Sequence, residues 1–343
     1  MRIARRAATV LPTILLWPGF LKAQDAINEL DSFSLNWAEP AEAVSPPGRC
    51  CAGVTYDPAT HTTLMFGGFT NPTFLNDTWI ATVRDGWTKL SPAASPSPRQ
   101  GPGLVYDGAV GNVLLFGGKS SNGTFLNDTW TWDGVTWTQQ FPPVSPPARE
   151  LDQPGMAYDA PMRRVVLFGG ITTGGTVLGD TWTWDGIAKT WRRRFPASSP
   201  PPRRGPTAYD EATNTVVLFG GDDPNANIFY NDTWTWDGTT WTQMFPASSP
   251  SPRAEASMAY DDVLKAVMIF GGTGTWAGPS EEYNDLWAWD GNNWTELHPA
   301  VAPPARYAAV MNYDDASLTL LLFAGFSTYT RDDTWLFGWV PAR

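Results

Sequence analysis

The residues best suited to catalysis are few in this sequence and far apart. The chain has only two histidines, His61 and His298, and two cysteines, Cys50 and Cys51. His61 is expected in a turn on one face of the fold and His298 in a link near the other face, so the two imidazoles cannot bind one metal ion. No Gly-x-Ser-x-Gly turn, phosphate-binding loop or zinc-ligand pair is present in the sequence. We therefore expect no metal, no cofactor and no catalytic residues.

Cys50 and Cys51 are neighbours, so burial of apolar surface rather than a disulfide framework must hold the fold. A trans peptide keeps adjacent Cα atoms about 3.8 Å apart, below the usual disulfide range of about 4.4–6.8 Å. We interpret the pair as two thiols, or as a pair that oxidises incidentally, in preference to a redox site. The sequence leaves the disulfide state of the pair open.

Two series of charged residues recur along the chain in matching phase. The arginines are Arg49, Arg99, Arg149, Arg203, Arg253 and Arg306, and the aspartates are Asp77, Asp128, Asp180, Asp232, Asp285 and either Asp332 or Asp333. Equal numbers in one phase predict a repeated structural contact of each arginine with a carboxylate or with the backbone. A ring of arginines that binds an anion is the alternative, and the matching aspartates count against it.

Other polar and aromatic residues break this regularity, and they are our candidates for ligand binding. The first group lies between Thr273 and Tyr283 and consists of Trp276, Glu281, Glu282 and Tyr283, and the second consists of Glu150, Asp152 and Arg204. An aromatic ring beside carboxylates can stack on a sugar and accept its hydroxyls, or anchor a protein partner. The competing interpretation is a loop whose tryptophan packs on its own repeat.

These residues are carried by a repeat of 50 to 53 residues in six copies. Each copy contains Tyr-Asp and, ten residues after the tyrosine, Phe-Gly-Gly, or Phe-Ala-Gly in the last copy. An Asp-x-Trp element follows, and in five copies an Asp-Gly pair and a second tryptophan come after it. Asp-Gly between two extended segments predicts a tight hairpin turn. Each copy therefore predicts four antiparallel strands, which we name a to d, with a proline-rich link that ends strand d.

This pattern has a Gly-Gly doublet that closes strand b, a tyrosine before the first turn and a tryptophan after the second turn. It resembles the kelch repeat and covers residues 33–337. The resemblance implies an all-β fold, a β-propeller whose blades are arranged radially around a channel. The chain is similar to secreted bacterial kelch proteins and to the propeller of galactose oxidase. The copper site of that enzyme needs two histidines at one place, which His61 and His298 do not supply.

Six blades follow from the number of copies, and spacing predicts how the ring closes. The second tryptophan of a copy precedes an arginine by 12 residues, and one more such pair, Trp37 and Arg49, precedes the first strand a. The last copy leaves no room for a strand d, so we expect residues 33–37 to complete it and to remove the exposed edge. The predicted propeller spans residues 24–343, with blades at about 49–98, 99–148, 149–202, 203–252, 253–305 and 306–337 plus 33–48.

The irregular segments are expected on a single face of the ring. The distance from the phenylalanine of strand b to the tryptophan of strand c varies from 12 to 17 residues, whereas the distance from tyrosine to phenylalanine is constant. The b–c loops and the starts of strand a lie on the same face of an antiparallel blade, around the channel mouth. Loops on a rigid scaffold are the usual place for binding residues.

The N-terminus and the net charge predict where the protein works. Residues 1–23 have a basic start, an apolar run and a Leu-Lys-Ala end, which is typical of a signal peptide cleaved after Ala23. The apolar run is too short to span a bilayer. The net charge of −11 becomes −15 without this segment, and such a surface repels nucleic acid. We expect a secreted or periplasmic monomer.

From these features we expect a non-enzymatic recognition module that binds a protein or glycan on the face of the b–c loops. The alternative is a small-sugar enzyme of the sialic-acid epimerase (mutarotase) type, with Glu150, Asp152 and Arg204 as acid–base groups at the channel mouth. Propellers support unrelated activities, so the fold alone does not decide between the two.

Overall fold

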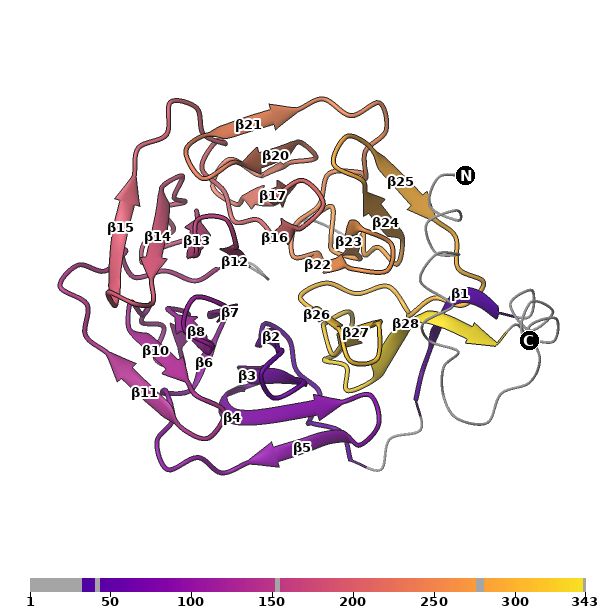
Figure 1. The fold of residues 1–343 in the computed structure, drawn as a ribbon, viewed down its shortest axis with the longest axis horizontal. Helices are drawn as coiled ribbons and strands as arrows, with labels where there is room; N and C mark the ends of the chain where they lie inside the picture. The colour runs from indigo at the N-terminus through magenta and orange to yellow at the C-terminus, as the bar shows by residue number, and fades with distance from the viewer. Residues whose placement is uncertain (1–32, 41–43, 152–154, 276–280, 342–343) are drawn as a thin grey trace.

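The computed structural model describes residues 33–40, 44–151, 155–275 and 281–341, and these form a ring of six β-sheets (Figure 1). Each sheet has four antiparallel strands, and successive repeats follow one another round the ring. The prediction of a six-bladed all-β propeller is confirmed. The proposed signal peptide lies outside the described residues, as do Asp152 and Trp276. In the part of the chain that the structure describes, no helix has the length and apolarity needed to cross a membrane.

The strands of each blade run in order from the axis outward, a to d. Strands a are β2 (Gly53–Asp57), β7 (Gly103–Asp107), β12 (Met156–Asp159), β16 (Thr207–Asp210), β22 (Ser257–Asp261) and β26 (Val310–Asp314). Strands b are β3 (Thr62–Thr70), β8 (Asn112–Phe116), β13 (Arg164–Phe168), β17 (Thr215–Phe219), β23 (Ala266–Phe270) and β27 (Thr319–Phe323). Strands c are β4 (Thr73–Thr82), β10 (Thr129–Trp132), β14 (Thr181–Asp185), β20 (Thr233–Trp236), β24 (Leu286–Trp289) and β28 (Thr334–Pro341). Strands d are β5 (Gly86–Leu90), β11 (Trp137–Gln140), β15 (Thr190–Arg194), β21 (Trp241–Met244), β25 (Trp294–Leu297) and β1 (Phe33–Ala38).

Two short strand pairs lie outside the blades, at the ends of b–c loops. They are β6 (Arg99–Gln100) with β9 (Lys119–Ser120), and β18 (Asp222–Asp223) with β19 (Ile228–Phe229). The first pair joins the start of strand a to the b–c loop of blade 2. The second is a hairpin within the b–c loop of blade 4, and Arg204 at the start of strand a pairs with its Asp222. In both blades the start of strand a is thus paired with the b–c loop. These two segments therefore lie side by side on one face of the ring, which we call the b–c face. The a–b and c–d turns lie on the opposite face, the a–b face.

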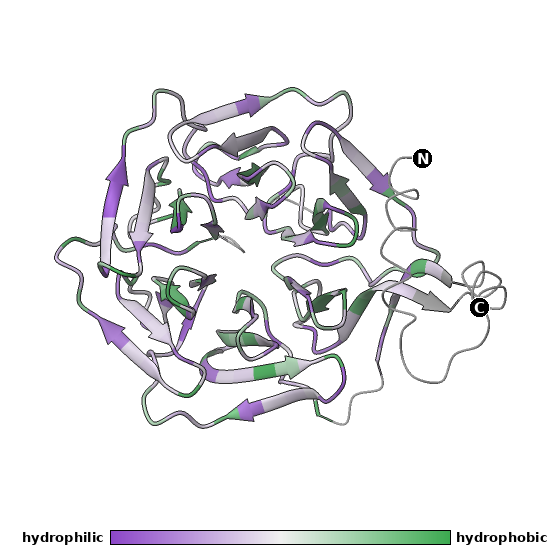
Figure 2. Cartoon of the chain, viewed as in Figure 1, coloured by the Kyte–Doolittle hydropathy of each residue, from purple (hydrophilic) through white to green (hydrophobic). Residues whose placement is uncertain are grey.

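Strand b is the most deeply buried strand of each blade because neighbouring blades cover both of its faces. In β8, the run Val113–Phe116 is fully buried, and Figure 2 shows the hydrophobic colour on this strand and its equivalents. A strand covered on both faces reads as a continuous apolar run rather than an alternating one. Strand b ends at a glycine pair such as Gly117-Gly118, where Gly117 has φ 68°. A Cβ at Gly117 would lie 2.8 Å from the carbonyl oxygen of Arg149, so this turn requires glycine.

One aromatic contact joins each blade to the next. The tryptophan of strand d packs on the phenylalanine of strand b in the preceding blade, with ring centroids 4.8–5.4 Å apart in all six cases. These pairs are Phe66–Trp137, Phe116–Trp191, Phe168–Trp241, Phe219–Trp294, Phe270–Trp37 and Phe323–Trp87. The contact round the ring is therefore the same at every blade boundary.

Strand β1 completes the last blade, as the spacing predicts. It pairs antiparallel with β28, with Trp37 opposite Phe337, and the sheet order is β1-β28-β27-β26. Trp37 also contacts Phe270 of blade 5, so the N-terminal strand makes the aromatic contact that a strand d makes elsewhere. Five of the six strand-d tryptophans donate from Nε1 to a threonine at 2.9–3.0 Å, but Trp37 Nε1 has no partner among the described residues. The equivalent position is Leu286, because this copy reads Asp-Leu-Trp where the others read Asp-Thr-Trp.

Candidate functional site

The repeated arginines and aspartates form one buried contact in each blade. Each arginine is 0–1% exposed and holds its aspartate through two nitrogens, at 2.6–3.0 Å in five of the pairs. The pairs are Arg49–Asp77, Arg99–Asp128, Arg149–Asp180, Arg203–Asp232, Arg253–Asp285 and Arg306–Asp333. The same arginine donates to the carbonyl at the first glycine position after strand b, and the strand-c tryptophan donates to the aspartate. None of these six guanidinium groups is exposed to an anion in solution.

The residue after each arginine begins the channel mouth on the b–c face. These six residues are Cys50, Gln100, Glu150, Arg204, Ala254 and Tyr307. Each pairs with a b–c loop residue of its own blade. The scaffold is therefore the same in every blade up to the arginine, and the next position carries a different side chain in each copy.

Backbone hydrogen bonds join the starts of strands a of neighbouring blades on the b–c face. Ala308 N donates to Glu255 O, Cys51 N to Ala308 O and Gly101 N to Cys51 O, at 2.8–3.2 Å. Leu151 N continues the series by donating to Gly101 O at 3.0 Å. Cys51, Ala308 and Glu255 have φ between 51° and 58°, a left-handed conformation that is strained for these residue types. This chain of bonds runs through blades 5, 6, 1, 2 and 3.

Arg204 is the central charged residue of this mouth. Its guanidinium makes two hydrogen bonds of 2.8 and 3.0 Å to the buried carboxylate of Asp222, and it lies 3.6 Å from Glu255. Arg204 therefore has carboxylate partners from its own blade and from the next one. A fork of this kind fixes the orientation of the guanidinium.

Glu150 lies in the same cluster. Gln100 Nε2 donates to Glu150 Oε1 at 2.6 Å. Burial raises the pKa of the Glu150 carboxyl, while Gln100 and the charge of Arg204 oppose the rise. The candidates Glu150 and Arg204, which come from neighbouring blades, are thus brought together. Asp152, the third member of that group, lies outside the described residues.

The two cysteines lie beside this cluster. Cys50 and Cys51 are free thiols whose Sγ atoms are 3.0 Å apart. The hydrogen bond with Cys50 and then burial raise the pKa of the Cys51 thiol, and Glu255 and Glu150 add to the rise. A thiol with a raised pKa is a poor nucleophile at neutral pH. This environment does not favour a catalytic role for Cys51.

The other candidate group, in the b–c loop of blade 5, is only partly described. Trp276 lies outside the described residues. Tyr283 lies with its ring 4.3 Å from the guanidinium carbon of Arg253, so one face of the ring covers the structural arginine. Glu281 is exposed, and Glu282 pairs with Thr273 within the loop. Glu281 is therefore the described carboxylate of this loop that is most open to a partner.

Sequence reasoning missed Glu255, Asp222, Gln100 and Tyr307. A signal was present, because all except Asp222 occupy the first or second position after a repeated arginine. Asp222 gave no such signal, since it meets Arg204 only when the b–c loop folds back on the start of strand a. No group of three or more histidine, cysteine, aspartate or glutamate side chains is placed to hold a metal ion within the described ranges.

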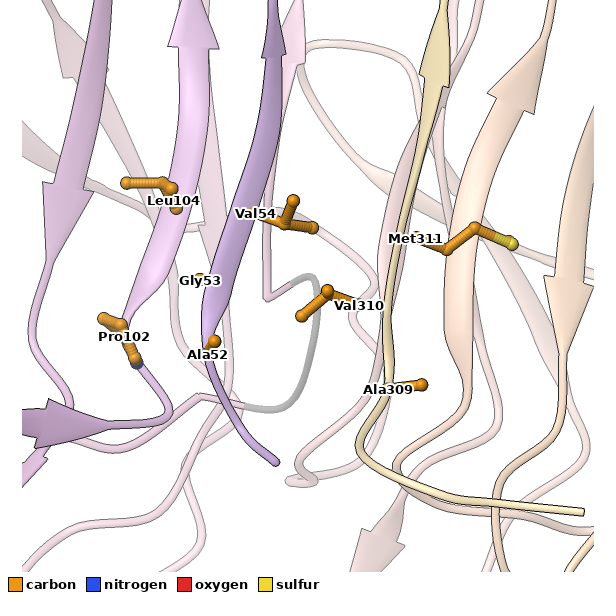
Figure 3. A pocket seen from close by; sticks show the side chains of 8 residues that line it. All are labelled: Ala52, Gly53, Val54, Pro102, Leu104, Ala309, Val310 and Met311. Carbon is orange, nitrogen blue, oxygen red and sulfur yellow. The ribbon is translucent and has the colours of Figure 1, made fainter. Parts of the chain in front are cut away.

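A cavity along the axis of the ring lies away from the predicted binding face. This cavity of about 270 Å³ is lined by strand a of all six blades and lies toward the a–b face, because its lining runs from positions such as Val54 to Tyr56 and on to Glu211. A second space, of about 10 Å³, lies between β2, β7 and β26 (Figure 3). Its lining includes Val54, Leu104 and Val310, and it holds one water at most.

Comparisons with known proteins are consistent with this architecture. The profile described as "KLHDC2/KLHL20/DRC7 Kelch-repeats domain" matches residues 4–193, 80–244 and 162–340. The F-box/kelch-repeat protein At1g51550 of Arabidopsis thaliana is 32% identical over 127 residues, which is 34% of this chain and 26% of that protein. The match to this relative therefore spans about a quarter of its length.

Proposed function

The chain belongs to the kelch-repeat family, and from this premise we propose that it is a recognition module that binds a partner protein on the b–c face. The observation that carries the proposal is the contrast within each blade. The buried arginine is the same in all six copies, and the residue after it differs in all six. A surface with such differences can recognise a partner that lacks six-fold symmetry.

Charge favours a basic partner surface. Among the described residues of this face, the carboxylates of Glu150, Glu255, Glu281, Glu282 and Asp223 outnumber the basic groups of Lys119, Arg204 and Arg331. Asp222 already holds Arg204. The chain as a whole carries a net charge of −11. Association with a basic partner is accelerated by such a charge and slows as the salt concentration rises.

Selection of peptides tests this proposal. Random peptides displayed on phage are selected on the protein lacking residues 1–23, and a glycan array is run in parallel. Hydrogen exchange then shows which amides a selected peptide protects. We expect protection of the b–c loops and a loss of about tenfold in affinity with Trp276→Ala or Glu281→Gln.

Glu296→Gln is the matched control, because it removes the same charge from the outer strand β25 and should leave affinity unchanged. Protection confined to the a–b face would contradict the proposal. Glycan binding without any peptide binding would replace the protein ligand by a carbohydrate.

Secretion is part of the proposal and has a separate test. Residues 1–23 have the composition of a signal peptide. We expect protein recovered from outside the cytoplasm to begin at Gln24, as N-terminal sequencing would show. Recovery only from the cytoplasm with an intact N-terminus would refute it.

A small-sugar enzyme of the sialic-acid epimerase (mutarotase) type is the second candidate function, and Glu150 favours it. A carboxyl with a raised pKa beside an arginine is suited to proton transfer. The 270 Å³ cavity, however, lies toward the other end of the channel. Exchange between the anomers of N-acetylneuraminic acid, followed by NMR with wild type and Glu150→Gln, tests this function, since equal rates with the two proteins would eliminate it.

A further inference from the structure

The outer edge of blade 3 carries a cluster of basic side chains. Strand β15 is the outermost strand of this blade, and no strand pairs with its outer side among the described residues (Figure 1). Four of the chain's 23 basic residues lie within six consecutive positions there, and they are Lys189, Arg192, Arg193 and Arg194. Figure 2 shows the hydrophilic colour over the second half of β15. We call these four residues the basic edge.

The basic edge has no carboxylate partner within its own blade. The residues opposite its three arginines on β14 are Thr181, Trp182 and Thr183. None of the four basic side chains forms an ion pair within the described part of the chain. Arg164 of the same blade, by contrast, pairs with Asp185 at 2.8 Å. The basic edge is therefore a positive charge that the blade itself does not balance.

Like charges lie close together along β15. Side chains of a strand alternate between its two faces, so Arg192 and Arg194 share one face, and Arg193 shares the other with Phe195, the residue after the strand. The guanidinium of Arg193 lies 5.1 Å from the ring of Phe195, which is 81% exposed. Repulsion between these arginines destabilises the free protein, and a negative group beside them would relieve it.

Protection of the sheet edge does not account for so many charges. A charged side chain on an edge strand prevents unwanted pairing between molecules. The other five strands d carry one charged side chain or none, namely Lys89 in β5 and Glu296 in β25. If protection required a row of arginines, those strands would carry one as well. The basic edge is therefore a particular feature of blade 3.

The unpaired edge and its charge together indicate the chemistry of a partner. Alternate residues of an edge strand direct N–H and C=O groups away from the sheet, and another polypeptide strand can pair with them. A long polyanion would extend over the rest of the surface, where the net charge of −11 repels it. A short acidic strand contacts the arginines well within the Debye length, which is about 8 Å at physiological salt. These conditions favour an extended acidic peptide.

We propose that the outer edge of β15 binds an acidic segment of a partner protein as an additional antiparallel strand. Consecutive acidic residues of this segment lie opposite Arg194, Arg193 and Arg192, in that order, and an apolar residue before them lies against Phe195. The order follows from antiparallel pairing, which all strands of the blade share. This site goes beyond the recognition surface proposed above, which lies on the b–c face and favours a basic partner.

Three labelled peptides test the pairing by fluorescence anisotropy. They are Val-Glu-Glu-Glu-Thr-Thr, the reversed sequence Thr-Thr-Glu-Glu-Glu-Val, and Val-Gln-Gln-Gln-Thr-Thr, each flanked by Gly-Ser. We expect the first peptide to bind about tenfold more tightly than the glutamine peptide, and about threefold or more tightly than the reversed one. Equal affinity for the two acidic peptides would show attraction without strand pairing and would overturn the proposal. No saturable binding of the first peptide would also overturn it.

Two double variants locate the site. Arg192→Gln with Arg193→Gln removes two charges from the basic edge and should weaken the first peptide about tenfold. Arg84→Gln with Lys89→Gln removes two charges from the outer part of blade 1 and is the matched control, with unchanged affinity expected. All four side chains are exposed, so both variants should fold, as thermal unfolding would confirm. Equal losses of affinity in the two variants refute the assignment.

Heparin distinguishes an acidic peptide from a polyanion. If heparin binds the protein through Arg192 and Arg193 and the first peptide does not bind, the basic edge is a polyanion site and the proposal is wrong. Glu281→Gln, on the b–c face, should leave the affinity for the acidic peptide unchanged. A failure at the edge of blade 3 therefore leaves the recognition surface on the b–c face untouched, and the reverse also holds.

Discussion

The b–c end and the a–b end of the ring hold their buried aspartates in opposite ways. At the b–c end, burial alone would raise the pKa of Asp128, but the hydrogen bonds and charge of Arg99 lower it, and the same holds for the equivalents in four other blades. At the a–b end, the aspartate after the repeated tyrosine caps a turn through backbone N–H groups. There burial raises the pKa of four of these aspartates, Asp107, Asp159, Asp210 and Asp261.

The difference teaches how each end of the ring satisfies its buried polar groups. At the b–c end each buried charge has a partner, so the inner part of that face is rigid, and variation is confined to the residues that follow the arginines. At the a–b end, the buried hydroxyls of Tyr260 and Tyr313 have no partner among the described residues.

The largest expected effect compares one arginine from each end. Arg149→Met leaves Asp180 without its buried partner and should lower the free energy of unfolding by about 3–5 kcal/mol. Arg164→Met, at the a–b end, removes a partly exposed pair with Asp185 and should cost at most about 1 kcal/mol. Urea unfolding of both variants measures the difference. If both variants lose a similar free energy of unfolding, the arginine–aspartate pairs at the b–c end do not stabilise the fold more than the pair at the a–b end.

The pH dependence should have opposite signs at the two ends. Burial raises the pKa of Asp261 to about 6, whereas the pKa of an unfolded aspartate is about 3.9. Its contribution to the free energy of unfolding is therefore complete below a pH of about 4 and is lost as the pH rises through 6. Over this pH interval the free energy of unfolding of the wild type should fall by up to about 3 kcal/mol relative to that of Asp261→Asn. Urea unfolding from pH 3 to 8 measures it.

Asp128 provides the opposite case. Its pKa is lowered, so its contribution is present above the unfolded value and is lost as the pH falls below it. The free energy of unfolding of Asp128→Asn should therefore approach that of the wild type as the pH falls. A difference between the two that grows on acidification, or an Asp261→Asn difference that is flat with pH, would contradict the contrast between the ends.

A smaller effect concerns the closure of the ring, where Trp37 Nε1 has no partner in the described part of the chain. Leu286→Thr and Leu286→Val create side chains of the same shape, and only threonine can accept the indole N–H. We expect the threonine variant to be the more stable by about 1 kcal/mol, the reverse of the usual order in a core. Thr78→Val removes the acceptor of Trp137 Nε1 and should lower the free energy of unfolding by about the same amount. Denaturant midpoints decide both comparisons.

The smallest effect tests the Tyr260 hydroxyl, which has no partner among the described residues. Tyr260→Phe should leave stability unchanged within about 0.5 kcal/mol or raise it, because the hydroxyl has no partner among the described residues. Tyr56→Phe removes a hydrogen bond to Asp315 and should cost up to about 1 kcal/mol. Thermal unfolding compares them. A clear loss in Tyr260→Phe would mean that its hydroxyl is already satisfied.

Much of the fold was predictable because its signals are local and repeated. Tyr-Asp, Phe-Gly-Gly and Asp-Gly each mark a strand end or a turn, and their recurrence in five or six copies removes the ambiguity of any single one. The position of Trp37 was predictable for the same reason, since it stands at the repeat spacing before Arg49 and the last copy lacks a strand d. The sites were less predictable. Trp276 and Asp152 remain predictions, and the ring of Tyr283 is partly used in covering Arg253.

The sequence by itself determined the number of blades, the order of strands and the way the two chain ends meet, because each of these follows from spacing along the chain. Only the tertiary structure decided which polar atoms are satisfied. Arg204 reaches Asp222 and Glu255 from two blades, and Asn312, Tyr260 and Glu211 line one cavity from three. Such convergence depends on how closely six inner strands approach a common axis, and no local pattern of residues encodes that distance.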